Sequence, residues 1–175
     1  MIPSSATSQD RKAAKWHRGF TMVEMMAVIA VIAILSLLAI PSYQGRIIRQ
    51  QIESALPLAD IAKKPIAASW SAVQVFPPDN AAAGLPPSEK IVNNTVSALS
   101  VQDGAIHITF GNRAHKAISG KTLTLRPAVV DDAPVVPVTW VCGNAEGPGK
   151  MTIRGGNQTS VPNTYLPLEC RARKN

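Results

Sequence analysis

The chain has 175 residues, two cysteines and a formal net charge of +7, from 18 Lys and Arg against 11 Asp and Glu. This length holds one domain with a core of ordinary size together with one long helix. The charge is too modest to indicate a nucleic-acid partner, and two thiols without nearby histidines make an incomplete metal site.

Residues 1–19 are polar and basic and show no apolar periodicity. We interpret them as a cleaved cytoplasmic leader that takes no part in the fold. Four basic residues and one acidic residue would hold this end on the cytoplasmic side of a membrane, so that the remainder is exported. A conventional secretory signal is the rival interpretation, but its apolar region is shorter, about 7–15 residues, and ends at an Ala-x-Ala-like site.

The segment from Phe20 to Ile40 contains 21 residues, of which only Glu24 is charged. At a rise of about 1.5 Å per residue, a helix of this length spans roughly 30 Å, the hydrocarbon thickness of a bilayer. The segment is therefore predicted to be a transmembrane helix. An ionised side chain costs about 2.5–3.5 kcal/mol at the bilayer centre and less near its ends. Glu24 is therefore either an interfacial or protonated residue, or a functional residue that needs a charge partner.

A cut after Gly19 would supply that partner, because the new α-amine of Phe20, with a reference pKa of about 8, is cationic at neutral pH. The hexapeptide Gly19–Glu24 (GFTMVE), followed by an apolar helix, resembles the class III signal of type IV pilins. The resemblance implies cleavage between Gly19 and Phe20 by prepilin peptidase, N-methylation of Phe20, and a role for Glu24 in filament assembly. It also implies a helix bend at Pro41, where pilins leave the membrane.

Beyond residue 40 the helical pattern continues. Apolar residues recur every three or four positions and form one stripe: Ile48, Ile52, Ala55, Ala59, Ala62, Ile66, Trp70 and Val73. One helix is therefore predicted from Phe20 to about Val75, apolar all round in its first half and amphipathic in its second. Pro57 and Pro65 each remove a helix hydrogen bond and should bend or open the helix locally.

After a Pro-rich loop at residues 76–88, the periodicity changes to that of strands. Asp103-Gly104 is a type I′ hairpin signal. Strands are predicted at residues 96–102, 105–110, 121–130 and 137–142. An antiparallel sheet of about four strands on the helix stripe gives an α+β fold.

Alternation along the strands predicts which side chains face the helix. His107 lies between apolar residues and is expected on the solvated face. The residues expected to face inward are Ile106, Ile108, Phe110, Leu123, Leu125, Val136, Val138 and Trp140.

From Gly143 to Asn175 the chain is rich in Gly, Pro and Asn. Cys142 and Cys170 are expected to form one disulfide in an oxidising compartment. The surroundings of both cysteines, residues 139–142 and 165–171, are similar to the C-terminal disulfide region of pilins.

No catalytic residue, metal site or cofactor is predicted. His107 and His115 have no acid or cysteine arranged around them, and Asp131-Asp132 precede Ala-Pro, which favours a hairpin turn. Gly147-Pro148-Gly149-Lys150 lacks the spacing of a phosphate loop.

The basic C-terminus is expected to be solvated. Arg171, Arg173 and Lys174 are interpreted as a solvated tail, with DNA contact as the alternative, and no aromatic residues are interleaved with them.

The chain is therefore predicted to be a structural, non-enzymatic subunit of a type IV pilus. Its parts are a leader (1–19), a transmembrane and assembly half of the helix (20–42) and a globular pilin domain (43–175). The precursor is expected in the inner membrane, with its N-terminus cytoplasmic and its C-terminal domain periplasmic, and the assembled form in an extracellular filament.

The partners that the resemblance implies are copies of the chain itself, prepilin peptidase, the pilus assembly machinery and, before assembly, membrane lipid. DNA is a less favoured partner. The alternative functions are a minor pilin or pseudopilin, with a tip, DNA-binding or secretion role, and a periplasmic binding or enzymatic domain on an uncut anchor.

Overall fold

The structure is a computed structural model that describes residues 19–172, apart from the side chains of residues 38–42. The predicted leader, except Gly19, lies outside the described residues, as do Arg173 and Lys174. Pro41, where a helix bend is predicted, is one of the residues whose side chains are not described. The chain divides between Ile40 and Pro41 into two compact units.

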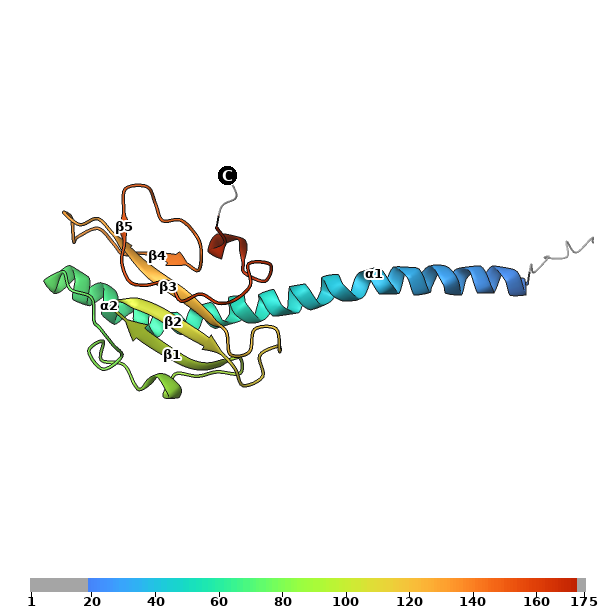
Figure 1. Cartoon of the computed structure of the whole chain (residues 1–175), viewed down its shortest axis with the longest axis horizontal. Coiled ribbons are helices and arrows are strands. Elements are labelled where there is room, and N and C mark those ends of the chain that lie inside the picture. The colour runs from blue at the N-terminus through green and yellow to red at the C-terminus, as the bar shows by residue number, and fades with distance from the viewer. Residues whose placement is uncertain (1–18, 173–175) are drawn as a thin grey trace, which may run out of the picture. The chain divides into compact units, whose positions relative to one another are not determined.

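The predicted helix is present but consists of three consecutive elements (Figure 1). Helix α1 spans Met22–Ala55, the 3-10 turn η1 spans Leu56–Ala59, and α2 spans Asp60–Val73. Pro57 lies in the first turn of η1. Because proline has no N–H to donate and fits a tighter first turn, the α-helix gives way to 3-10 geometry there, as expected from the sequence. Pro65 lies inside α2 without ending it.

The apolar stripe on these helices is buried as predicted, with one exception. The buried members are Ile48, Ile52, Ala55, Ala59, Ala62, Ile66 and Trp70. The prediction is wrong for Val73, which is 64% exposed. The reason is local, because Gln74 adopts a left-handed conformation (φ 56°) and donates its N–H to the carbonyl of Trp70, which ends α2 beside Val73.

The predicted antiparallel sheet is also present. Its strands are β1 (Val96–Gln102), β2 (Ala105–Phe110), β3 (Thr122–Val129) and β4 (Thr139–Cys142), in that spatial order, and the short β5 (Thr152–Ile153) pairs with β3. Asp103 and Gly104 both have positive φ, 49° and 80°, as a type I′ turn requires. The fold is therefore α+β, as expected. Strand β5 was not predicted, because two residues are too few to show the alternation of a strand.

One hydrophobic cluster joins the helix stripe to the inner face of the sheet. Ile106, Ile108 and Phe110 of β2 and Leu123 and Leu125 of β3 are buried in it, as predicted. Val136, Val138 and Trp140 were expected to face inward but are only partly buried, with Trp140 packed against the cluster.

The outer face of the sheet is covered as well, which the strand pattern did not predict. The segment that follows β5 lies over β2 and β3, where the N–H of Gln158 donates to Oγ1 of Thr124 and the N–H of Thr124 donates to Oγ1 of Thr159. The expectation of a solvated His107 is therefore wrong, since only 3% of this residue is exposed.

Candidate functional site

The N-terminal end of α1 begins with a capped turn. The N–H of Glu24 donates to Oγ1 of Thr21 at 3.2 Å, and the N–H of Met25 donates to the carbonyl of Thr21 at 3.1 Å. Thr21 is therefore the N-cap residue, and Glu24 lies at the third helical position. The spacing Thr21-x-x-Glu24 is the sequence of a capping box. That signal could have identified Thr21 as the N-cap of the helix, which the sequence analysis did not predict.

The following turns of α1 are apolar on every side and exposed within their unit. The large exposed side chains are Phe20, just before the helix, and then Met22, Val23, Met25, Met26, Val28, Ile29, Val31, Ile32, Ile34, Leu35 and Leu37. An apolar surface this extensive is far larger than a soluble monomer normally leaves in water. Exposed apolar surfaces of this size typically mark sites that interact with other proteins or with membranes.

Over the residues that the structure describes, no helix has the combined length and hydropathy of a membrane span.

Glu24 is the single charged residue in this apolar surface. It lies in the first turn of α1, where the positive end of the helix dipole favours an acidic side chain. Within residues 19–172, no ion pair includes its carboxylate. Gly19 and Phe20 immediately precede this turn: Phe20 is 69% exposed, and a methyl group added at Gly19 would meet no atom of the described residues within 4 Å.

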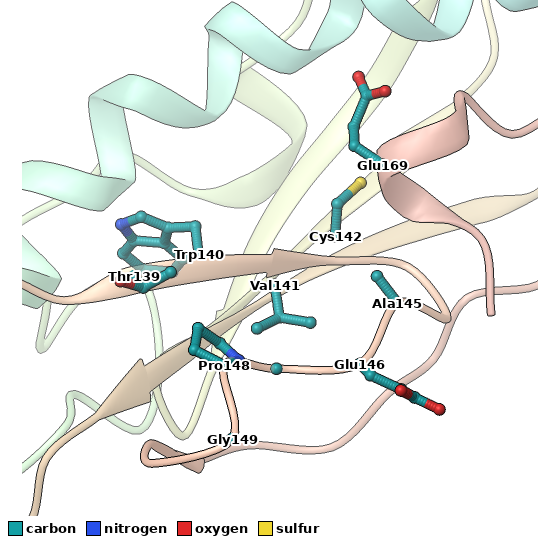
Figure 2. A pocket seen from close by; sticks show the side chains of 10 residues that line it. Thr139, Trp140, Val141, Cys142, Ala145, Glu146, Pro148, Gly149 and Glu169 are labelled. Carbon is teal, nitrogen blue, oxygen red and sulfur yellow. The ribbon is translucent and has the colours of Figure 1, made fainter. Parts of the chain in front are cut away.

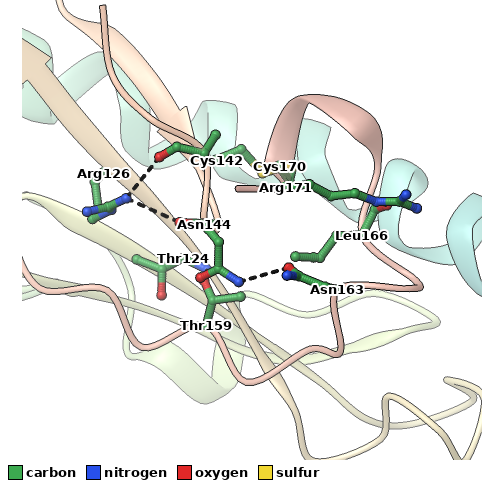
Figure 3. The surroundings of a disulfide bond; sticks show 11 residues. Thr124, Arg126, Cys142, Asn144, Thr159, Asn163, Leu166, Cys170 and Arg171 are labelled. Carbon is green, nitrogen blue, oxygen red and sulfur yellow. Dashed lines mark hydrogen bonds between the residues drawn. A yellow bond between two sulfur atoms is a disulfide. The ribbon is translucent and has the colours of Figure 1, made fainter. Parts of the chain in front are cut away.

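The predicted disulfide is present and joins the end of β4 to the turn η3 (Leu168–Cys170) (Figure 3). Both Cys142 and Cys170 are buried in the main hydrophobic cluster. Gly143 beside them has a positive φ of 56°, and a Cβ added there would lie 2.7 Å from the carbonyl oxygen of Cys170. The chain can therefore pass the disulfide at this position only with glycine.

Two arginines hold the segments on either side of the disulfide. Nη2 of Arg126 donates to the carbonyls of Gly143 and Ala145 (3.2 and 3.4 Å), and burial lowers the pKa of its guanidinium. Nε of Arg171 donates to the carbonyl of Leu166 at 2.7 Å. The expectation that Arg171 belongs to a solvated tail is therefore wrong, because it is a half-buried residue that is hydrogen-bonded to the backbone.

His107 is a structural residue of the outer sheet face. Its Nδ1 lies 3.0 Å from Oγ1 of Thr124, the residue paired with it on β3. Desolvation by burial lowers the pKa of His107 below its ordinary value. Its Nε2 is buried and has no partner among the described atoms. The neutral imidazole is therefore the form that this site accommodates.

Asp131 and Asp132 occupy the turn between β3 and β4, as predicted. Asp131 accepts hydrogen bonds from Nη2 of Arg154 and Oγ1 of Thr152, both at 2.7 Å. These bonds, first that of Arg154 and then that of Thr152, lower the pKa of the Asp131 carboxyl. The two aspartates therefore do not form a catalytic pair, since Asp131 is engaged in anchoring β5.

A groove of about 430 Å³ runs along β4 (Figure 2). Strand β4 and the loop at residues 145–149 line it together with Glu169. Its two acids, Glu146 and Glu169, come from different segments and lie apart in Figure 2. The groove therefore brings no two carboxylates together for acid–base chemistry.

Comparison with known proteins adds two family matches. Residues 49–171 match the family of pilins, the subunits of bacterial filaments, and residues 17–40 match the prokaryotic N-terminal methylation motif. The second match includes Gly19, Phe20 and Glu24.

Three curated relatives are similar over most of this chain. A type IV major pilin protein, PilE of Neisseria gonorrhoeae, is 31% identical, over 88% of this chain and 93% of its own length. The fimbrial protein EcpC of Eikenella corrodens is 34% identical, over 88% and 90%. A fimbrial protein of Neisseria meningitidis serogroup A is 32% identical, over 88% and 94%.

Proposed function

Because this chain belongs to the type IV pilins and is a structural subunit of a pilus, we propose that it is made as a membrane-anchored precursor, cut between Gly19 and Phe20, and polymerised with copies of itself. Prepilin peptidase performs the cut in this proposal, and Phe20 becomes the N-methylated first residue. The apolar segment at 20–40 holds the precursor in the inner membrane, with the remainder in the periplasm, until the assembly machinery extracts it.

The observation that carries the proposal is the exposed apolar surface of α1 with one acid in its first turn. Lipid satisfies that surface before assembly, and the same surfaces of neighbouring subunits satisfy it afterwards. Since both surroundings are apolar, the transfer gains little from the hydrophobic effect. Helix packing and polar contacts must stabilise the filament, and an external motor must drive extraction.

Glu24 is the residue for which the two surroundings differ. In the dry interior of a filament its carboxylate needs a counter-charge. The cut provides one, because the α-amine of Phe20 is cationic near neutral pH. In our proposal the amine of one subunit pairs with Glu24 of its neighbour. Assembly is then conditional on processing, since an uncut chain has no such amine.

The second unit, residues 41–175, would form the outside of the filament. The covered outer sheet face and the disulfide between Cys142 and Cys170 support this role, because both tie the irregular C-terminal segment to the sheet. An extracellular surface benefits from such bonds where no chaperone can repair unfolding.

Mass spectrometry of subunits from filaments sheared off cells tests the proposal. We expect a chain that begins at Phe20 with one methyl group on its amine. Filaments built from chains that begin at Met1 would refute it. Gly19→Leu should leave the leader attached and abolish filaments, whereas the control Gly19→Ala should still be cut.

The same preparation separates a major pilin from a minor pilin or pseudopilin. A major pilin is the most abundant chain in the sheared filaments, as the names of the relatives in Neisseria gonorrhoeae favour. A pseudopilin would be absent from sheared material, and a minor pilin would be rare in it.

A further inference from the structure

Two arginines from distant parts of the sequence converge on one backbone oxygen in the unit at residues 41–175. Nη2 of Arg49, on α1, and Nη2 of Arg171, after η3, each donate to the carbonyl of Thr164 at 3.2 Å. The two nitrogens are therefore no further apart than twice that distance. The additional bond from Nε of Arg171 to Leu166 fixes the second guanidinium in place.

The two positive charges have no acidic partner in the described part of the chain, where ion pairs join only Lys63 to Asp60 and Arg154 to Asp131. Carbonyl oxygens fix the guanidinium groups but carry no net charge, so two like charges stay close without compensation. Each guanidinium also has five N–H donors, most of them unused here. The Nε of Arg49 is buried and has no partner among the same residues.

We propose that Arg49 and Arg171 together bind a phosphate group. Paired guanidinium forks match the several acceptor oxygens of a phosphate and would relieve the repulsion between the two cations. The place of Arg49 in the sequence favours phosphate over carboxylate. Arg46 and Arg49 are the first charged residues after the apolar segment at 20–40, where an anchored chain meets lipid headgroups.

The phosphate can come from a lipid headgroup or from a soluble phosphate. The lipid source rests on the membrane-anchored precursor proposed above, and the soluble source does not. NMR of the full chain, labelled with ¹⁵N-arginine in micelles of an uncharged detergent, distinguishes them. Inorganic phosphate is titrated against sodium chloride of equal ionic strength. In a second series, phosphatidylglycerol or phosphatidylcholine replaces part of the detergent.

We expect phosphate, but not chloride, to shift the Nε–Hε signals of Arg49 and Arg171 along one saturating curve. A saturating response to phosphatidylglycerol at lower concentration than to inorganic phosphate would assign the lipid source. The reverse order would assign the soluble source. Absence of a saturating response to either probe would refute the site. An equal response to acetate would also refute it and would indicate a carboxylate, such as one from a second copy of the chain.

Arg49→Gln should weaken phosphate binding at least about tenfold, because it removes one charge-assisted partner. Arg49→Lys should retain part of the binding, since it keeps the charge but loses the fork. The control is Arg113→Gln, the same charge change at an exposed arginine that donates only through its backbone in the described structure. If Arg171→Gln loosens the end of the chain, the comparison of Arg49→Gln with Arg49→Lys alone tests the site. If Arg113→Gln weakens phosphate binding as much as Arg49→Gln does, the site is refuted.

The two proposals can fail separately. Filaments that form normally from a chain without phosphate binding would reject this site and leave the pilus function intact. Conversely, a chain that binds phosphate but is never cut would reject the proposed processing alone.

Discussion

Removal of the disulfide tests whether the covalent loop or the surrounding packing holds the C-terminal segment on the sheet. The perturbation is the double variant Cys142→Ala/Cys170→Ala, which avoids free thiols in the hydrophobic cluster. The bond closes a loop of 29 residues, with partners 28 positions apart. On the chain-entropy model, its loss destabilises the fold by about 3.6 kcal/mol. For a unit of this size the melting temperature should fall by roughly 10–15 °C.

The helix stripe should survive this loss. Ile48, Ile52 and Ile66 share their cluster with buried residues of β1, β2 and β3 that lie outside the loop, and a domain stability of about 5–15 kcal/mol exceeds the predicted loss. We therefore expect circular dichroism of the full chain in detergent to show native helix content at 25 °C. Hydrogen exchange should accelerate at residues 155–170 and change little at α2.

Val161→Ala is the matched control for this experiment. It removes apolar atoms from the same segment, where Val161 is 3% exposed, and leaves the covalent loop closed. Its effect should be about 1 kcal/mol or somewhat more. If the double variant melts within a degree of the wild type, the loop does not act through chain entropy. If its helix is lost together with the loop at 25 °C, the stripe is not independently stable.

Three further predictions concern other parts of the molecule. Ile66→Ala, at a fully buried position, should cost about 2–5 kcal/mol in urea unfolding, whereas Ile61→Ala, at a position 50% exposed, should cost well under half of that. The unfolded chain protonates His107 at higher pH than the folded chain, because burial lowers the pKa of His107 in the folded state. The unfolding free energy should therefore be highest above pH about 6.5 and fall as the pH drops below it. His107→Gln should flatten this dependence. Glu24→Gln should leave cleavage at Gly19 intact, as judged by mass spectrometry, but reduce the number of filaments seen by electron microscopy; unchanged filament numbers would count against a counter-charge role.

The helix stripe and the hairpin between β1 and β2 could be predicted, because the sequence patterns that specify them are local. The three-and-four spacing from Ile48 to Trp70 continues through η1, so the interruption at Pro57 does not rotate the stripe away from the sheet. Asp103-Gly104 likewise encodes its turn in two residues. The failure at Val73 is also local in cause, but Gln74 in a left-handed conformation carries no sequence signature, because glycine and asparagine are the residues that usually mark it.

The outer sheet face and the C-terminal segment could not be predicted, because contacts between segments that are distant in sequence determine their structure. His107 has the spacing of a solvated residue, and only the later segment with Gln158 and Thr159 buries it. Arg171 likewise reads as part of a basic tail until the carbonyls of Thr164 and Leu166 are placed beside it. In both cases, fully for His107 and partly for Arg171, partners that no periodicity reveals take a polar residue out of water.

Thr21 and Glu24 show how one short motif can serve two states of the same chain. Within a single subunit, Thr21 caps α1, and the helix dipole favours an acid at position 24 without any partner. A defect of Glu24→Gln could therefore arise from a weaker helix start as well as from a missing charge. Glutamine also fits the third position of a capping box, but it removes the charge and with it the interaction with the helix dipole. Thr21→Val provides the complementary loss, since it removes the cap and keeps the acid. If the filament defect follows Glu24→Gln and not Thr21→Val, the charge of Glu24 is the property on which assembly depends.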